Sequence, residues 1–218
     1  AVMQRDMLDV NKIHFILASL EDVTPLVTHI DAQVQQCREE FNLQPLKHYR
    51  AQYAIPNRFD TAEVIYVKRM LQVALPQPLR ARITAELFAR HVSKDERDFA
   101  EQLYCSPAQL REMAENGMSI GGHGYAHNWL DSLTPAQQAE DIDQSMAMLQ
   151  SIGALSPHFL FCYPYGAYNQ TTLALLKERG CAAAFTTKLG IASIGQNPML
   201  ELPRIDTNDL PHAAQAQR

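Results

Sequence analysis

The sequence has 218 residues, and 46% of them are hydrophobic, so the chain is long enough to bury a sizeable core. Its formal net charge of -5 is spread without a block of lysine and arginine, which argues against a nucleic-acid partner and an anionic-membrane surface. No apolar run reaches the roughly 18 residues of a transmembrane helix, so we expect no membrane-spanning segment.

The four cysteines indicate reduced thiols rather than a metal or redox motif. They are widely separated and form no Cys-x-x-Cys pair, standing at Cys37, Cys105, Cys162 and Cys181. Reduced thiols favour a cytoplasmic location, although an upstream segment could carry a secretion signal. The first ten residues, AVMQRDMLDV, resemble neither a signal peptide nor a natural start, so we expect that a segment precedes them.

The first half of the chain is predicted to be helical. A helix is expected to begin at Thr24, because apolar side chains then recur every three to four residues, at Leu26, Ile30 and Val34. Asp60 is positioned to cap the segment TAEVIYVKRMLQVAL, and Pro76 interrupts the chain before a further helical segment. We interpret residues 60 to 104 as a helical insertion packed beside a core sheet.

After residue 105 the sequence predicts alternating helices and strands. Capping boxes at Ser106 and Thr134 begin two helices, each with proline at its first position. Strands are predicted in four segments, MSIGG, HFLFCY, CAAAFTT and MLELPRI. This alternation indicates a parallel sheet wrapped by helices, either a barrel or an open doubly wound sheet. In both architectures chemistry gathers where strands end, as they do at His123 and at the segment YPYG.

His123 and His127 are the candidate metal ligands. Residues four apart share one face of a helical turn, so both rings could reach one ion. Zinc proteases use this spacing with glutamate after the first histidine, and Gly124 at that position excludes them. The alternative is a pair of ordinary hydrogen-bonded histidines near the surface. A metal beside the backbone donors of the FCYPYGAYN turn would be a hydrolytic arrangement.

Two segments resemble motifs of the polysaccharide deacetylases, the nodulation-protein-B homology group or carbohydrate esterase family four. SIGGHGYAHNWL resembles their His-x-x-x-His metal motif, and CYPYG resembles their Arg-x-Pro-Tyr-Gly motif, in the same order and at a similar spacing. Members of this family use a divalent metal, commonly zinc, to remove acetyl groups from N-acetylated sugars. The resemblance implies an α/β fold, a distorted (β/α) barrel incomplete at its N-terminus. It would form a single domain over residues 1–218, with its motif-bearing core over about 106–210.

The same resemblance implies roles for individual residues. His123 and His127 would bind the metal, and the backbone N–H of Tyr165 would stabilise the oxyanion. Three residues are predicted to contact substrate, Pro164, Tyr163 and Trp129. Aromatic rings suit this role because they offer flat faces to a sugar, although rings beside a strand end are more often core residues.

The sequence departs from the family in its acidic residues. The family's Thr-Phe-Asp-Asp-Gly motif, which supplies the third metal ligand and the general base, does not occur. The nearest candidates are Asp6, Asp9 and Asp60. Asp6 and Asp9 follow no apolar strand, and Asp60 is better placed to cap a helix. We therefore expect the first strand, with both aspartates, to lie outside this chain.

Two further family motifs are altered. Cys162 stands where the family has arginine, and Arg204 is the candidate replacement. Leu210-Pro211-His212 matches the family's Leu-x-His motif in letters, but proline stands where a strand should run, so we reject it as the general acid.

The leading hypothesis is a metal-dependent deacetylase of cell-surface polysaccharide biosynthesis, acting on the N-acetyl groups of a sugar or polysaccharide. It would be a hydrolase of carbon–nitrogen bonds other than peptide bonds, with zinc as cofactor and an N-acetylated carbohydrate as partner, and this chain would lack its catalytic base. One alternative is a non-catalytic relative that binds carbohydrate or a partner. Another is a structural domain of a larger biosynthetic assembly. The sequence indicates neither the sugar nor the oligomeric state.

Overall fold

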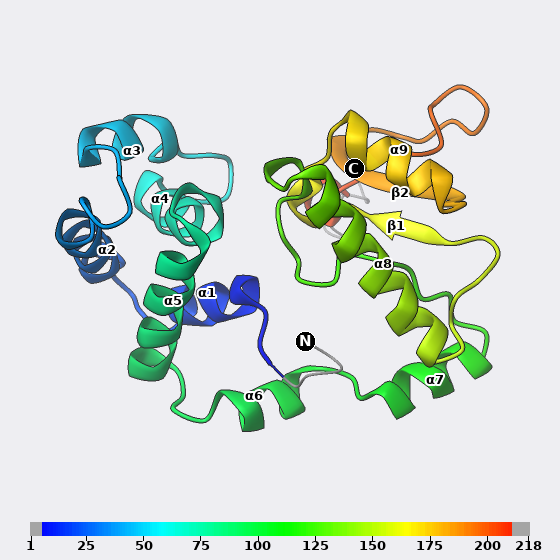
Figure 1. The fold of residues 1–218 in the computed structure, drawn as a ribbon, viewed down its shortest axis with the longest axis horizontal. Helices are drawn as coiled ribbons and strands as arrows, with labels where there is room; N and C mark the ends of the chain where they lie inside the picture. Colours follow the sequence, from blue (N-terminus) through cyan, green and yellow to red (C-terminus); the bar gives the residue numbers. More distant parts are fainter. Residues whose placement is uncertain (1–5, 211–218) are drawn as a thin grey trace, which may run out of the picture. The chain divides into compact units, whose positions relative to one another are not determined.

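The computed structural model describes residues 6–210, and the chain divides into two compact units, Ala1–Tyr104 and Cys105–Arg218. We call them the N-terminal unit and the C-terminal unit. The first contains helices, and the second combines helices with a sheet (Figure 1). The boundary falls close to residue 106, where the sequence pattern changes from helices alone to alternating helices and strands.

Helices α1 to α6 build the N-terminal unit (Figure 1). They span Asp9–Ala18, Thr24–Gln36, Leu46–Tyr53, Ala62–Arg69, Gln77–His91 and Glu96–Leu103, with a π-helical turn at Met70–Ala74 after α4. The predicted helix at Thr24 is confirmed as α2, and its apolar stripe of Leu26, Ile30 and Val34 is buried. Within residues 6–60, the helices α1, α2 and α3 come before the predicted insertion, so helical structure begins earlier than expected. The insertion itself stays a prediction.

The expected cap at Asp60 is wrong. Thr61 caps α4 instead, because its hydroxyl accepts a hydrogen bond from the backbone N–H of Val64 at 3.4 Å. The Asp60 carboxylate forms an ion pair with Lys68, at 2.7 Å from its Nζ atom. The lysine two turns along the helix therefore holds the side chain that was expected to cap it.

The C-terminal unit alternates helices with parallel strands. Its helices are α7 (Pro107–Glu115), α8 (Pro135–Ser151) and α9 (Gln170–Glu178). Its strands are β1 (Leu160–Cys162), β2 (Ala183–Leu189) and β3 (Leu202–Arg204). Short 3-10 turns lie at η2 (Leu130–Ser132), η3 (Pro164–Gly166) and η4 (Thr207–Asp209). The capping boxes at Ser106 and Thr134 are confirmed as the starts of α7 and α8.

The three strands form a parallel sheet in the order β1-β2-β3. The predicted strand MSIGG is wrong as a strand, because the segment makes a single parallel bridge, Gly122 with Phe161. That bridge still lies beside β1, so His123 and the turn after β1 reach the same edge of the sheet. The described residues thus form an α/β unit, while the barrel stays a prediction.

Aromatic side chains of β1 and its flanks fill the core of the C-terminal unit. Phe159, Phe161 and Tyr163 alternate along the chain and are all buried. The Phe161 ring packs edge-on against Phe159 and Tyr163, at centroid distances of 6.1 and 5.7 Å. This packing fixes the position of the turn that follows β1.

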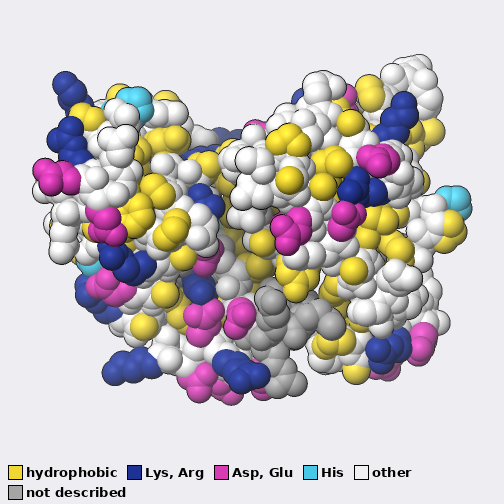
Figure 2. Space-filling view, viewed as in Figure 1, with side chains coloured by type: hydrophobic (Ala, Val, Ile, Leu, Met, Phe, Trp, Pro, Cys, Tyr) yellow, Lys and Arg dark blue, Asp and Glu magenta, His cyan; other side chains and the backbone are white. Residues whose placement is uncertain are grey.

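Surface charge agrees with the dispersed pattern of the sequence. On the face drawn in Figure 2, basic and acidic side chains are interspersed within each unit. Over residues 6–210, no helix has the length and apolar character needed to cross a membrane.

The hydroxyl of Thr134 accepts a hydrogen bond from Gln137 N at the start of α8. Thr134→Ala should therefore lower the free energy of unfolding of the C-terminal unit by about 1 kcal/mol. The single tryptophan, Trp129, lies in this unit, so urea unfolding followed by its fluorescence measures the change. Thr134→Ser keeps the hydroxyl and is the matched control. Equal losses in the two variants would contradict the capping role.

Candidate functional site

His123 is held by the main chain of β1. Its Nδ1 atom lies 2.7 Å from the carbonyl oxygen of Cys162, next to the bridge of Gly122. Because a carbonyl oxygen only accepts, Nδ1 of His123 carries the proton, and Nε2 of the neutral ring carries the lone pair. Metal-binding histidines are commonly oriented by such a bond from the other ring nitrogen.

The ring of His127 meets the ring of His123. The two Nε2 atoms are 3.1 Å apart, and the rings are nearly perpendicular at 81°. With Zn–N bonds of about 2.05 Å, this separation corresponds to an N–Zn–N angle of about 100°, close to tetrahedral. The same distance also suits a hydrogen bond from His127 N–H to His123. The geometry therefore fits either two ligands of one ion or a hydrogen-bonded pair.

Two residues of the site other than glycine have left-handed backbones. His127 has φ 56° and Tyr165, within η3, has φ 58°, a region that residues other than glycine seldom adopt. Each such residue costs on the order of 1–3 kcal/mol and persists only when its surroundings hold it. The Tyr165 ring helps to hold both residues. It packs edge-on against the His127 ring at a centroid distance of 4.8 Å, and it stacks on the Trp129 ring at a centroid distance of 5.0 Å and an interplanar angle of 18°.

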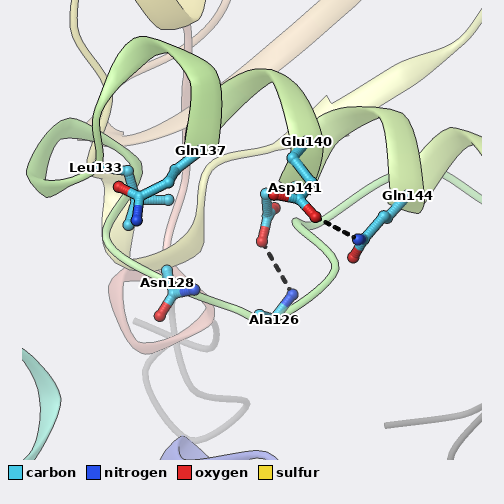
Figure 3. A pocket seen from close by; sticks show the side chains of 7 residues that line it. All are labelled: Ala126, Asn128, Leu133, Gln137, Glu140, Asp141 and Gln144. Atoms are coloured by element: carbon cyan, nitrogen blue, oxygen red, sulfur yellow. Dashed lines mark hydrogen bonds between the residues drawn. The ribbon is translucent and has the colours of Figure 1, made fainter. Parts of the chain in front are cut away.

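The loop between the two histidines contacts α8 through Asp141. Oδ1 of Asp141 accepts from Tyr125 N at 2.9 Å. Its Oδ2 atom accepts from Ala126 N at 3.0 Å, and Figure 3 shows this second bond. Asp141 as a residue is only 6% exposed. The sequence reasoning missed this residue. The available signal was its helical spacing, which places a charged side chain on the buried face of α8 with Gln138, Ile142, Ser145 and Leu149.

Gly124 lets the histidine loop approach both α8 and the η3 turn. It has φ 70°, and a Cβ atom there would lie 2.9 Å from Oδ1 of Asp141 and 3.1 Å from Cγ of Pro164. The loop, the helix and the turn therefore meet at a position that has room for glycine alone.

A cavity of about 180 Å³ lies between the segment after this loop and α8 (Figure 3). Its polar lining comes from Asn128, Gln137, Glu140 and Gln144, together with Asp141. Glu140 accepts a hydrogen bond from Gln144 at 3.1 Å, so its carboxylate has a partner on its own helix.

Two of the predicted substrate contacts, Tyr163 and Pro164, are buried, and their contact with substrate stays a prediction. Tyr163 is 1% exposed, donates its hydroxyl proton to the carbonyl oxygen of Leu200 at 2.7 Å and stacks on Tyr168. Burial raises the pKa of the Tyr163 hydroxyl far above its ordinary value. Pro164 is also buried, against the position of Gly124. Tyr163 alternates with Phe159 and Phe161 and so faces the core, the Pro164 ring lies in the turn that follows β1, and Trp129 remains, half-buried, at the site.

The other candidates lie elsewhere. Arg204 ends β3, and its Nε atom donates to the carbonyl oxygen of Thr186 at 2.8 Å, so its role as a replacement arginine stays a prediction. Asp6, Asp9 and Asp60 belong to the N-terminal unit. His212 lies outside the described residues.

Within residues 6–210, no group of three or more histidine, cysteine, aspartate or glutamate side chains is arranged to hold a metal.

Comparison with known proteins relates the chain to deacetylases. The model of the polysaccharide deacetylase family matches residues 77–184. YxkH of Bacillus subtilis strain 168, whose name places it among the polysaccharide deacetylases, is 34% identical over 97 residues. The match covers 44% of this chain and 34% of that protein, so the chain spans about a third of this relative's length.

Two solved structures are similar. IcaB from Ammonifex degensii is 30% identical, with 46% of this chain and 47% of that chain covered and a TM-score of 0.40. The deacetylase PplD from Streptococcus pyogenes, solved in complex with acetate, is 21% identical. The match covers 81% of this chain and 78% of the PplD chain, with a TM-score of 0.45.

Gly124→Ala should destabilise the C-terminal unit more than Gly153→Ala. Both glycines have φ near 70°, so each alanine carries a cost of about 1–2 kcal/mol for its left-handed backbone. A Cβ atom at Gly153 meets nothing within 4 Å, whereas one at Gly124 must displace Asp141 or Pro164, at a further cost of about 1 kcal/mol. Urea unfolding followed by Trp129 fluorescence compares the two. Equal losses in the free energy of unfolding would show that Asp141 and Pro164 can move away from the added methyl group without an energetic cost.

Proposed function

Because the chain belongs to the polysaccharide deacetylase family, we propose that it forms the metal-binding part of a hydrolase that removes acetyl groups from an N-acetylated carbohydrate. Family homology by itself suggests a hydrolase that acts on carbon–nitrogen bonds. The proposal of a metal site rests on the convergence of two imidazole rings. Nε2 of His123 and Nε2 of His127 lie 3.1 Å apart, and Nδ1 of His123 is bonded to the main chain.

His123 and His127 would hold a divalent metal, with zinc the best fit to two imidazole ligands. When bound, such a metal polarises an acetyl carbonyl and lowers the pKa of a bound water toward neutrality. A catalytic zinc site takes three protein ligands and one open position, so we place the third ligand and the general base outside residues 6–210.

The η3 turn and its neighbours would bind the substrate. Tyr165 turns the backbone just after β1 ends, so we assign its N–H to the oxyanion that forms when water adds to the acetyl carbon. Its ring stacks on Trp129 beside His127, and this pair offers an aromatic surface to the apolar face of a sugar ring. Main-chain donor, aromatic surface and imidazoles then lie at one edge of the sheet.

Zinc binding by the purified chain tests the metal site. We expect one zinc ion per chain near pH 7.5, measured by elemental analysis and titration calorimetry. His123→Ala and His127→Ala should each weaken the affinity at least about 10-fold, because each removes one of the two described ligands. His158→Ala is the matched control, since His158 is an exposed histidine of the same unit. A chain that takes up no zinc would overturn the metal site.

A second candidate function is carbohydrate binding without catalysis. It is favoured by the stacked pair of Trp129 and Tyr165, and by the finding that residues 6–210 hold no group of three or more histidine, cysteine, aspartate or glutamate side chains arranged for a metal. Such a protein would bind the sugar whether or not zinc is present.

Trp129→Ala should weaken binding of a chitin oligosaccharide about 10-fold, because one aromatic contact is worth roughly 1–1.5 kcal/mol. Calorimetry with and without zinc measures the affinity, and Trp129→Phe keeps a ring as the control. Affinity that rises with zinc supports the hydrolase proposal, and affinity independent of zinc supports the second candidate. Unchanged affinity in Trp129→Ala would remove the aromatic pair from the substrate surface.

A further inference from the structure

One buried carboxylate binds the backbone of the loop that connects the two histidines. Of the three residues between His123 and His127, Tyr125 and Ala126 donate their N–H groups to opposite oxygens of Asp141. A buried charge is retained only where hydrogen bonds compensate its loss of water, and these two bonds do so. Successive N–H groups that converge on one anion form a concave nest, a stable backbone arrangement.

This nest produces the backbone shape that brings the rings together. The loop passes through left-handed residues at Gly124 (φ 70°) and His127 (φ 56°), an arrangement that a free peptide rarely adopts. The bonds to Asp141 lie between these two residues. They therefore act on the segment whose conformation decides where the His127 ring points relative to His123.

The carboxylate itself is carried by a rigid element. Helix α8 begins at the Thr134 capping box, and Gln138, one turn before Asp141, is anchored at both ends of its amide. Its Nε2 atom donates to the Leu133 carbonyl, and its Oε1 atom accepts from Thr172 of α9. Asp141 thus transmits the fixed position of α8 to a loop in which His123 is exposed to solvent.

We infer that Asp141 is a positioning residue of the proposed metal site. Acting through the backbone of Tyr125 and Ala126, it keeps the two Nε2 atoms converged before a metal binds. This inference rests on the proposed function, because the convergence of the two Nε2 atoms matters to activity only if they bind a metal. Groups that orient metal ligands without touching the metal typically contribute about 10- to 100-fold to its affinity.

Asp141→Asn tests the inference, with Glu140→Gln as its matched control. Asparagine offers one acceptor where the carboxylate offers two, and its NH₂ group would face a backbone N–H. Glu140 is the adjacent acid and lines the same cavity, but it bonds Gln144 instead of the histidine loop (Figure 3). In titration calorimetry of the full chain, zinc should bind about 10- to 100-fold more weakly to Asp141→Asn and unchanged to Glu140→Gln. Far-UV circular dichroism and Trp129 fluorescence check that all chains are folded.

A measurement on the metal-free chain separates this inference from the metal proposal. With ¹³C-labelled histidine, NMR should show a nuclear Overhauser effect between the rings of His123 and His127, whose centroids are 4.7 Å apart. We expect Asp141→Asn to lose this contact and Glu140→Gln to keep it. If the unaltered chain binds no zinc, the proposed function fails, and the ring contact alone then decides whether Asp141 positions the histidines. A ring contact and an affinity that both survive Asp141→Asn would overturn the inference.

Gly124→Ala provides a second route if Asp141→Asn does not fold. Its methyl group would press on Oδ1 of Asp141 without removing the carboxylate, and Gly153→Ala controls for the left-handed backbone. Loss of the ring contact in Gly124→Ala alone supports the inference. Retention of the contact in both variants contradicts it.

Discussion

The site depends on main-chain pairing between the histidine segment and β1. Gly122 donates to Leu160 O and accepts from Cys162 N, each at 2.8 Å, and the next residue, His123, bonds Cys162 O. These bonds extend the sheet by one residue and place the loop beside the turn at Tyr165. They require glycine at 122, because a Cβ atom there would lie 2.8 Å from the Phe161 ring. A few backbone bonds thus determine which side chains meet.

The aromatic residues near the carboxyl edge of the sheet divide into two groups with different tasks. Tyr163 faces inward, stacks on Tyr168 and anchors its hydroxyl on Leu200, so the base of the turn is fixed. Tyr165, two residues later, faces the histidines and stacks on Trp129. The left-handed backbone at Tyr165 makes this change of direction possible, and its energetic cost is offset by the packing on both sides of the turn.

Local signals in the sequence predicted much of this arrangement, and tertiary contacts decided the rest. Capping boxes at Ser106 and Thr134 were predictable because their hydrogen bonds join residues three apart. The segment before His123 was expected to be a strand, yet it makes one bridge, at Gly122. Burial of Tyr163 depends on which face of β1 meets the helices, and the contact of Asp141 spans 15 to 16 residues. Neither has a signature in a short window of sequence.

Recognition of His123 by a carbonyl oxygen has a consequence for the chemistry of position 162. A peptide carbonyl is present whatever the residue type, so a substitution of the Cys162 side chain leaves the bond that sets the His123 tautomer in place. Cysteine can therefore stand at 162, where the related motif has arginine, while the lone pair of His123 keeps its direction. At this position the main chain orients His123, and that bond makes no demand on the side chain.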